Sequence, residues 1–180
     1  MGQIIRLGKF VIQYISNIDH YKGVLSRVQN VKHSLWIGTA DIKDLYMEAE
    51  KEKKPFLALL AQLIRKGVEV RLIHAKEPGP AFREDFDRYP VLYDRLERVP
   101  CPRVHFKMLV FDFKEVYIGS ANLTGAGIGM KGEDKRNFEA GILTDEPTIV
   151  EQAMNQFDDV WIGKFCKKCK RRDFCHDPIK

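Results

Sequence analysis

The sequence predicts an α/β fold in which a mixed, largely parallel sheet carries helices on both faces. Apolar runs of strand length alternate with helix-like segments along the chain. A strand–helix–strand series fits within the stretch from residue 34 to residue 74, which is typical of a βαβ unit. The chain has 180 residues, of which 44% are hydrophobic and 31% charged, so it is large enough for a domain with its own core.

The first elements follow from apolar spacing. Residues 18–28 are expected to form a helix that ends near Asn30, and residues 34–38 are expected to form a buried strand. Residues 40–54 are highly charged, and we expect them to be helical or loop.

The βαβ unit is completed by a helix and a second strand. Pro55 stands at the start of a helix whose apolar residues recur at helical spacing. Gly67 is expected to end this helix in a left-handed conformation. Residues 68–74 alternate apolar and polar side chains, as a half-buried strand does.

Apolar spacing and breaker residues also predict the elements of the second half of the chain. Pro90 is expected to break or kink a helix within residues 81–97. The remaining elements are expected to be a loop at 77–80, a hairpin formed by 104–111 and 116–119, a mobile glycine-rich stretch at 125–136, a strand at 137–143 and a closing helix at 148–161. They complete a domain of residues 1–163, and a separate basic, cysteine-rich tail spans residues 164–180.

No apolar run approaches the roughly 20 residues that a membrane-spanning helix needs, since the longest, residues 56–61, has six. Arg6 and Lys9 precede a short apolar stretch near the N-terminus, but polar residues interrupt it and no small-residue cleavage site follows. We therefore expect no signal peptide and a cytoplasmic protein.

The net charge of +5 is carried by the tail. Residues 164–180 hold seven Lys or Arg and two acids, whereas the rest of the chain holds 23 bases and 23 acids. A neutral body with a basic tail indicates a polyanionic partner, either nucleic acid or an anionic membrane surface. The alternative is a terminus that its charges only keep soluble.

The stretch from residue 105 to residue 122 has the pattern H-x-K-x4-D-x6-G-S-x-N. Residues two apart on a strand face the same side, so His105 and Lys107 point together and Asp112 points away. Asp112 is therefore interpreted as an orienting or structural carboxylate. A phosphate held here would meet an ammonium charge, the amide of Asn122 and the hydroxyl of Ser120.

Histidine can act as a nucleophile and as a proton carrier near neutral pH, and its second ring nitrogen then needs an orienting acceptor. Glu139 is the candidate acceptor for His105. It shares one face of the predicted strand with Asn137, while the other face is apolar. The alternative is a simple surface strand.

The pattern resembles the signature of the phospholipase D superfamily, whose defining positions are matched by His105, Lys107, Asp112, Gly119, Ser120 and Asn122. The flanking stretches RKGVEVRLI and RNFEAGIL resemble the strands before and after that signature, so the resemblance covers about residues 17–162.

The resemblance implies an α/β/α sandwich and a hydrolase that uses no metal for catalysis. One histidine would attack phosphorus to give a phosphohistidine, and a second would protonate the leaving oxygen before water hydrolyses the intermediate. Lys107 and Asn122 would bind the phosphate, and Ser120 would assist. Glu139 would orient His105.

The family builds its active site from two copies of the motif, and this sequence holds one. His74 and Lys76 begin like a second copy, but the aspartate position falls on Ala81 and no G-S-x-N follows. A complete site therefore requires two chains. We expect a homodimer in which the two His105 side chains face each other across a two-fold axis.

The family pattern does not require the four cysteines of this sequence. Cys166, Cys169 and Cys175 form the pattern C-x2-C-x5-C, and Cys101 lies just ahead of the motif. Four thiolates, or three with His176, would suit a tetrahedral structural zinc. An iron–sulfur cluster, a disulfide and free thiols are the alternatives.

The leading hypothesis is a phosphodiesterase that cleaves nucleic acid, an endonuclease similar to the small dimeric members of the family. One alternative is a phospholipid-cleaving hydrolase with its tail on an anionic membrane. Another is a non-catalytic dimeric module that binds nucleic acid. Phe165 and Phe174 of the tail would stack on bases or pack in a core. The sequence does not distinguish DNA, RNA and lipid as substrates.

Overall fold

The computed structural model describes residues 4–43, 45–49 and 52–176. Its strands are β1 (Ile4–Leu7), β2 (Phe10–Ser16), β3 (Ser34–Thr39), β4 (Tyr46–Ala49), β5 (Glu52–Pro55), β6 (Glu69–His74), β7 (Glu97–Pro100), β8 (Lys107–Phe111), β9 (Glu115–Gly119) and β10 (Ala140–Thr144). Its α-helices are α1 (Phe56–Arg65), α2 (Pro80–Asp87), α3 (Val91–Arg95) and α4 (Pro147–Trp161). Short π and 3-10 turns span His20–Val24, Leu25–Asn30 and Arg172–Phe174.

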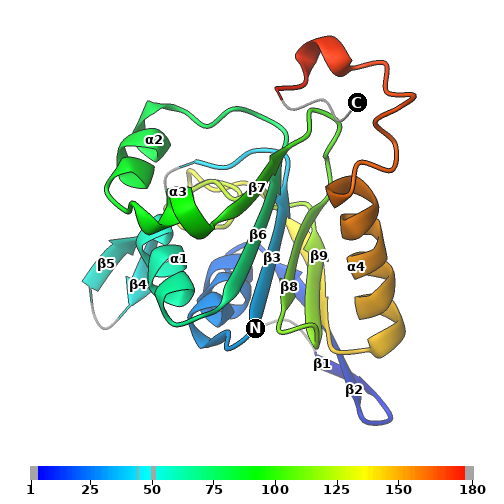
Figure 1. The fold of residues 1–180 in the computed structure, drawn as a ribbon. Coiled ribbons are helices and arrows are strands. Elements are labelled where there is room, and N and C mark those ends of the chain that lie inside the picture. The colour runs from blue at the N-terminus through cyan, green and yellow to red at the C-terminus, as the bar shows by residue number, and fades with distance from the viewer. Residues whose placement is uncertain (1–3, 44, 50–51, 177–180) are drawn as a thin grey trace.

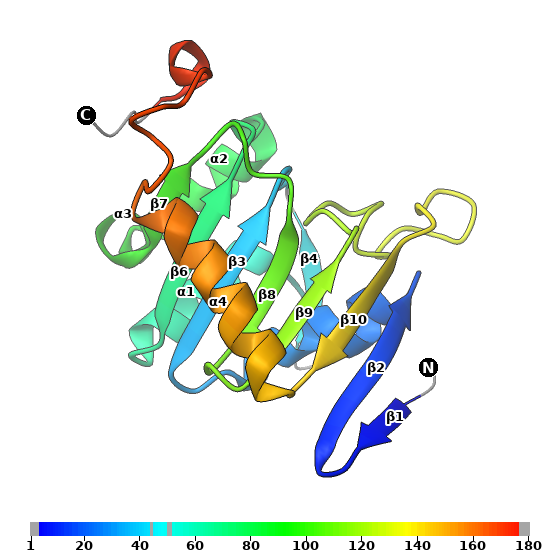
Figure 2. The same ribbon diagram turned by 90° about the vertical axis from the view of Figure 1, so that its right-hand side faces the viewer.

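Eight strands form one sheet in the order β1-β2-β10-β9-β8-β3-β6-β7, and β4 pairs with β5 in a separate hairpin. Helix α1 lies on one face of the sheet with α2 and α3 beside it, and α4 covers the other face (Figures 1 and 2). The predicted α/β class with helices on both faces is confirmed.

The sheet is mixed, as predicted, but most of it is antiparallel, which corrects the expectation of a largely parallel sheet. Only β3–β6 and β6–β7 pair in parallel among the described strands. The other neighbours run antiparallel. The parallel part is the predicted βαβ unit, because α1 connects β3 to β6. The antiparallel part is built from hairpins and from β10, which need no long crossover.

Two hairpins were not predicted from the sequence. Strands β1 and β2 turn at Gly8, whose φ is +61°, and β2 then pairs with β10. Strands β4 and β5 lie within residues 46–55, so the expectation of helix or loop is wrong there, while residues 40–43 form a loop as expected. The stretch is rich in Glu and Lys, which strands generally disfavour, and its pairing therefore leaves little trace in composition.

The helix boundaries predicted from proline and glycine are confirmed. Pro55 immediately precedes α1, Gly67 follows it with φ +88°, and α2 ends before Pro90 while α3 begins after it. The expected hairpin of β8 and β9 is also present. None of the helices among the described residues is long and apolar enough to cross a bilayer.

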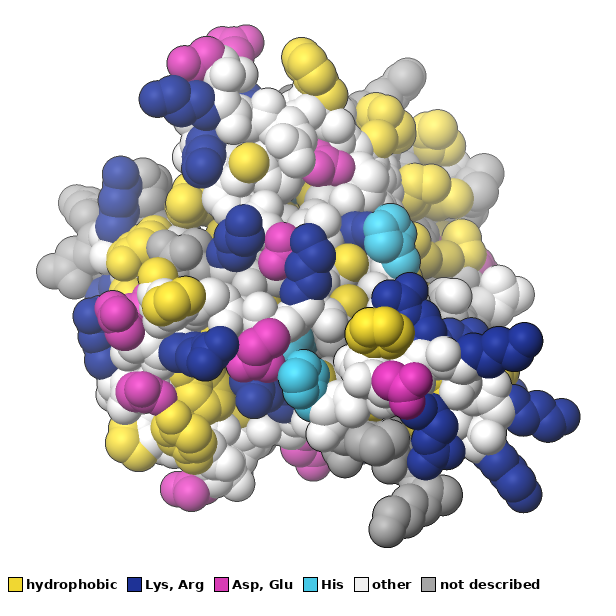
Figure 3. Space-filling view, turned by 90° about the horizontal axis from the view of Figure 1, so that it is seen from above, with side chains coloured by type: hydrophobic (Ala, Val, Ile, Leu, Met, Phe, Trp, Pro, Cys, Tyr) yellow, Lys and Arg dark blue, Asp and Glu magenta, His cyan; other side chains and the backbone are white. Residues whose placement is uncertain are grey.

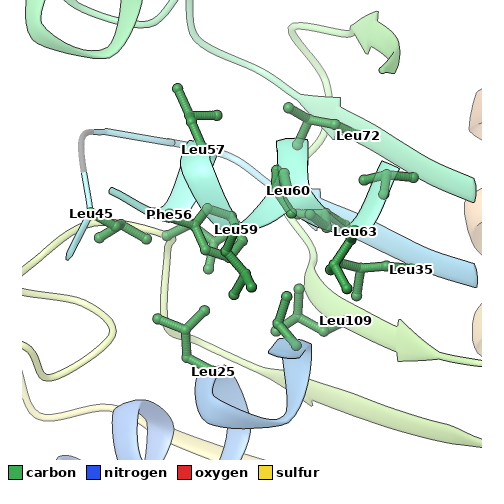
Figure 4. Close-up of a cluster of buried hydrophobic side chains, with 14 of the residues drawn as sticks. Leu25, Leu35, Leu45, Phe56, Leu57, Leu59, Leu60, Leu63, Leu72 and Leu109 are labelled. Carbon is green, nitrogen blue, oxygen red and sulfur yellow. The ribbon is translucent and has the colours of Figure 1, made fainter. Parts of the chain in front are cut away.

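The core has one layer on each side of the sheet. On the α1 side, Leu60 and Leu63 pack against Leu35, Leu72 and Leu109 of the sheet (Figure 4). On the other side, α4 buries Phe157 fully.

The Phe157 ring stacks on Trp36 with 4.9 Å between ring centroids. Burying such an aromatic side chain stabilises the fold by about 2 kcal/mol. The two layers fix the ends of β3, β8 and β9, where the candidate site lies.

Candidate active site

His105 and Lys107 lie where the loop of residues 101–106 enters β8. Lys107 Nζ lies 3.3 Å from Nδ1 and 3.4 Å from Nε2 of His105, and it donates to the His105 carbonyl at 2.8 Å. The lysine is 6% exposed, whereas the imidazole is open to solvent. Burial lowers the pKa of Lys107, and the negative charge of Glu139 opposes this shift.

Asn122 lies just after β9, and the loop that follows β3 holds its amide. Its Oδ1 accepts from the Asp41 N–H at 3.2 Å and lies 3.4 Å from Thr39 Oγ1, whose proton has a closer acceptor in the Asp41 carbonyl at 2.9 Å. Because a donor occupies the oxygen, the NH2 group is the part of the amide that can donate to a phosphate. Thr39 is fully buried and also accepts from the Leu123 N–H at 3.3 Å.

Thr39 and Asp41 therefore position Asn122, and the sequence interpretation missed both. The available signal was their place directly after the buried strand at 34–38. Loops at strand ends often carry functional residues.

Glu139 precedes β10 and is held by three neighbours. Its Oε1 accepts from Asn137 Nδ2 at 3.1 Å, and its Oε2 accepts a short hydrogen bond from Ser120 Oγ. Its backbone N–H donates to Asn17 Oδ1 at 3.2 Å. Asn17 directly follows β2 and has φ +46°, a left-handed conformation that Asn tolerates better than most residues. The unanticipated N-terminal hairpin thus fixes Glu139.

The expected bond from Glu139 to His105 is not formed among the described residues. The Glu139 charge acts on Lys107 and on His20 instead. Ser120 also differs from its expected part in phosphate binding. Its hydroxyl donates to Glu139 and accepts from the Ala140 N–H at 3.1 Å, so it ties β9 to β10 in this structure.

Asp112 lies at the opposite end of β8 from His105. Its carboxylate accepts from the backbone N–H groups of Lys32, His33 and Ser34 at 2.7–3.1 Å. Burial alone would raise the pKa of Asp112, but these bonds together lower it. With φ +51° it also occupies the tight turn between β8 and β9. These contacts agree with the interpretation of Asp112 as a structural carboxylate. They also hold it far from the His105 imidazole.

A buried pair, His20 and Tyr117, lies near the Glu139 carboxylate. The rings meet edge to face with 5.5 Å between centroids, and His20 Nδ1 contacts the Asn17 carbonyl at 3.0 Å. His20 Nε2 and the Tyr117 hydroxyl are buried with no hydrogen-bond partner in the described part of the chain. Burial lowers the pKa of His20 and raises that of Tyr117. This pair is not predictable from the sequence, because the two residues are 97 positions apart and meet only in the fold.

His74 is buried at the end of β6, as expected for a strand-end residue, and its Nδ1 lies 2.8 Å from the Lys76 carbonyl. The four cysteines are free and partly buried. Within residues 4–43, 45–49 and 52–176, no three His, Cys, Asp or Glu lie close enough together to hold a metal ion. The predicted zinc therefore finds no assembled site here.

The tail rises beside the site, and dark blue Lys and Arg side chains gather at the lower right of Figure 3, on the side where it lies. The Arg171 N–H donates to Cys169 Sγ at 3.4 Å, and this bond, together with Arg103 and Arg172, lowers the pKa of the Cys169 thiol.

A family model described as "Cardiolipin synthase, PLD-like domain" matches residues 24–161. No curated protein sequence matches the chain.

Solved structures resemble the fold at low sequence identity. NucT from Helicobacter pylori has a TM-score of 0.62 and 14% identity, with 84% of this chain and 95% of that chain covered. Nuc from Salmonella typhimurium, titled a phospholipase D family member, has a TM-score of 0.61 and 18% identity, with coverage of 85% and 95%. TrmBL2, titled an archaeal chromatin protein with a novel mode of DNA binding, has a TM-score of 0.56 and 14% identity, with coverage of 83% and 51%.

Proposed function

The chain belongs to the phospholipase D superfamily, and we propose that it hydrolyses phosphodiester bonds of nucleic acid. The observation that carries the proposal is the pair of His105 and Lys107, in which a buried ammonium group lies within 3.3–3.4 Å of both ring nitrogens of an exposed imidazole. A phosphate that approaches the imidazole would meet this positive charge and the Asn122 amide. Such preorganised donors stabilise the charge that develops on phosphoryl oxygens.

In the proposed reaction, one nitrogen of His105 attacks phosphorus and the bond to the leaving oxygen breaks. His105 of the partner subunit gives its proton to that oxygen, which leaves a phosphohistidine and a neutral imidazole. Water then attacks phosphorus, the phosphorus–nitrogen bond breaks, and the partner's His105 takes the proton from water. Glu139 supports the charged form of Lys107, which burial alone would weaken.

Two chains are proposed to complete the site, because each supplies one motif and leaves its imidazole open. The rim carries an apolar patch that a second copy could cover. Phe138, directly beside Glu139, is 95% exposed. On β10, which begins directly after Glu139, Ile142 is exposed and pairs with Tyr14 and Ile118, whose side chains are also exposed. Contiguous exposed apolar side chains are typical of protein–protein contacts.

Nucleic acid is the favoured substrate because the tail places exposed basic side chains beside the site. Phosphate contacts of this kind make binding strongly salt-dependent. TrmBL2, which shares the fold, is a chromatin protein by its title. A second candidate is hydrolysis of a phospholipid, which the description of the matching family model favours.

The test is turnover of single-stranded DNA, duplex DNA, RNA and phospholipid vesicles by the purified chain, measured at short times in chelator. We expect cleavage of nucleic acid in chelator, since a histidine nucleophile needs no metal-bound water. His105→Ala should lower the rate by on the order of 10³-fold or more. His33→Ala, which changes an exposed histidine at the far end of the sheet, is the matched control.

Three results would count against the proposal. Unchanged turnover in His105→Ala would exclude the mechanism. Immediate loss of activity in chelator that magnesium restores would indicate different chemistry. Hydrolysis of phospholipid alone would identify the second candidate.

A further inference from the structure

The tail after α4 turns its cysteines, and not its large apolar side chains, toward the domain. Within residues 162–176 the only residues that are not exposed are Gly163, Cys166, Cys169 and Cys175. In contrast, Ile162 is 65% exposed, Phe165 50% and Phe174 67%. Burial of apolar surface therefore does not account for the course of the tail. Segments too short to build a core are commonly held by cross-links or metals.

The thiols converge on one loop from two distant parts of the chain. Cys101, Cys166 and Cys169 line the same cavity of about 600 Å³, between the loop of residues 101–106, the end of α4 and the tail. Cys175 approaches that loop as well, with its Sγ 4.0 Å from the Pro100 carbonyl. All four are free thiols. Three of them line one cavity, and the fourth lies beside the residue that precedes Cys101.

Cys166 and Cys169 already form a compact turn. The Cys169 N–H donates to the Cys166 carbonyl at 3.0 Å, and the Arg171 N–H donates to Cys169 Sγ at 3.4 Å. A backbone N–H directed at sulfur stabilises a thiolate, which is the form that binds metals. Arg103 lines the same cavity, and Arg103 and Arg172 both act on Cys169, so positive charge is available near the thiolates.

We propose that Cys101, Cys166, Cys169 and Cys175 bind one thiolate-ligated metal centre that fastens the tail to the loop leading into His105. A zinc ion and an iron–sulfur cluster share this chemistry, since each accepts four cysteine thiolates. The described cysteines do not yet lie within metal-binding distance as a group. Binding therefore draws the tail onto the loop and displaces the thiol protons. The inference is independent of the proposed reaction, and its test needs no activity.

The primary experiment uses the full chain, purified without oxygen and without added metal. Zinc, iron and acid-labile sulfide are measured per chain, and the visible spectrum is recorded. About one zinc per chain without visible absorption identifies a zinc ion. Iron and sulfide in equal amounts, with broad visible absorption, identify a cluster. In either case the four thiols should react slowly with a thiol reagent until the metal is removed.

Variants then assign the ligands. Cys101→Ser and Cys175→Ser should each lower the bound metal by about tenfold or more, in line with the loss of one of four ligands. Phe174→Ala, in the same part of the tail, and His176→Ala should retain it. Trypsin should cut the tail at its exposed basic residues much faster after the metal is removed.

The inference fails if the wild-type chain holds no metal as purified or after reconstitution and its four thiols react at once. It also fails if mass measurement of the non-reduced chain shows two disulfides. Full metal content in Cys101→Ser would exclude the link between tail and loop. The metal content and thiol reactivity of the wild-type chain decide the matter even where a variant does not fold.

Discussion

Not every residue of the motif lies near His105. The Asp112 side chain makes structural contacts at the opposite end of β8. Its carboxylate accepts from three successive backbone N–H groups ahead of β3, at 2.7–3.1 Å. Each of these donors would lose a charged acceptor if the side chain were removed, and hydrogen bonds to charged groups contribute more than neutral ones. The strand alternation that placed His105 and Lys107 together also placed Asp112 on the other side.

Asp112→Ala should therefore lower the free energy of unfolding by about 2 kcal/mol. The variant should keep near-normal turnover where it remains folded. Urea denaturation and initial rates, measured on the same samples, separate the two effects. Glu84→Ala on the exposed face of α2 is the control, with no comparable loss of stability expected. A large loss of turnover in folded Asp112→Ala would place the carboxylate in the reaction.

Two buried histidines make stability depend on pH. Burial is the main cause that lowers the pKa of both His20 and His74 below the ordinary value. The unfolded chain therefore binds more protons than the folded one once the pH falls below about 6.5. Stability contributed by the neutral imidazoles is present above this pH and is lost as the pH falls.

We expect the free energy of unfolding to decrease between pH 7 and pH 5.5, by at most about 1.4 kcal/mol per pH unit for each histidine. The series stops there because burial raises the pKa of Glu115, which acts in the opposite direction at lower pH. His74→Gln should reduce the slope, and His33→Ala should not. Greater stability at pH 5.5 than at pH 7 would contradict the assignment.

At the scale of elements, prediction from sequence succeeds where spacing and a breaker residue coincide. Helix α1 lies between Pro55 and Gly67 and has a clear apolar face, so both its type and its ends are predictable. Strands β1 and β2 lack this combination of a breaker residue at each end and a clear apolar face. Their position in the sheet depends on the pairing of β2 with β10, which lies far along the chain. The antiparallel majority of the sheet follows from that pairing and so was not predicted.

The candidate site also combines residues that a local motif predicts with residues that only the fold brings together. His105, Lys107 and Asn122 can be named as candidates from the sequence because they lie in one continuous motif. Asn17 and Thr39, which hold Glu139 and Asn122, are 122 and 83 residues away from them and meet them only through the sheet. Nothing in the local sequence around Asn17 or Thr39 distinguishes them from ordinary strand-end residues.

The contact between β9 and β10 requires two glycines. Gly119 and Gly141 pair across the strands, and the Tyr117 ring lies over both. A Cβ at Gly141 would lie 2.5 Å from Tyr117 Cε2 and 2.9 Å from the Ile118 carbonyl, which real structures do not allow. The strands or the buried ring would have to move.

Gly141→Ala should destabilise the fold by about 1–3 kcal/mol, as overpacking of a core does. It should also lower turnover, because Glu139 lies directly before β10 and would move with it. Thermal unfolding and initial rates test both effects. Gly23→Ala is the matched control, since a Cβ there meets nothing within 4 Å. Equal stability of the two variants would show that the ring adapts without cost.

For the whole molecule, three features bear on how the proposed site is completed. They are the open imidazole of His105, the basic tail that shares a cavity with the loop of residues 101–106, and the exposed apolar patch that includes Phe138. A second copy that covered the apolar patch would bring a second motif toward the first. The substrate backbone would then pass between two basic tails. Assembly and activity should therefore be lost together.

Phe138→Glu tests this coupling, because it places a charge at the exposed rim without altering a buried contact. Wild-type chain should have the mass of a dimer in light scattering, and Phe138→Glu should shift toward the monomer. Its turnover should fall by about tenfold or more at low protein concentration and recover in part as the concentration rises, by mass action. Phe174→Glu, which changes an exposed phenylalanine of the tail, should remain dimeric. An active species with the mass of a single chain would show that one motif suffices, and the shared site would have to be abandoned.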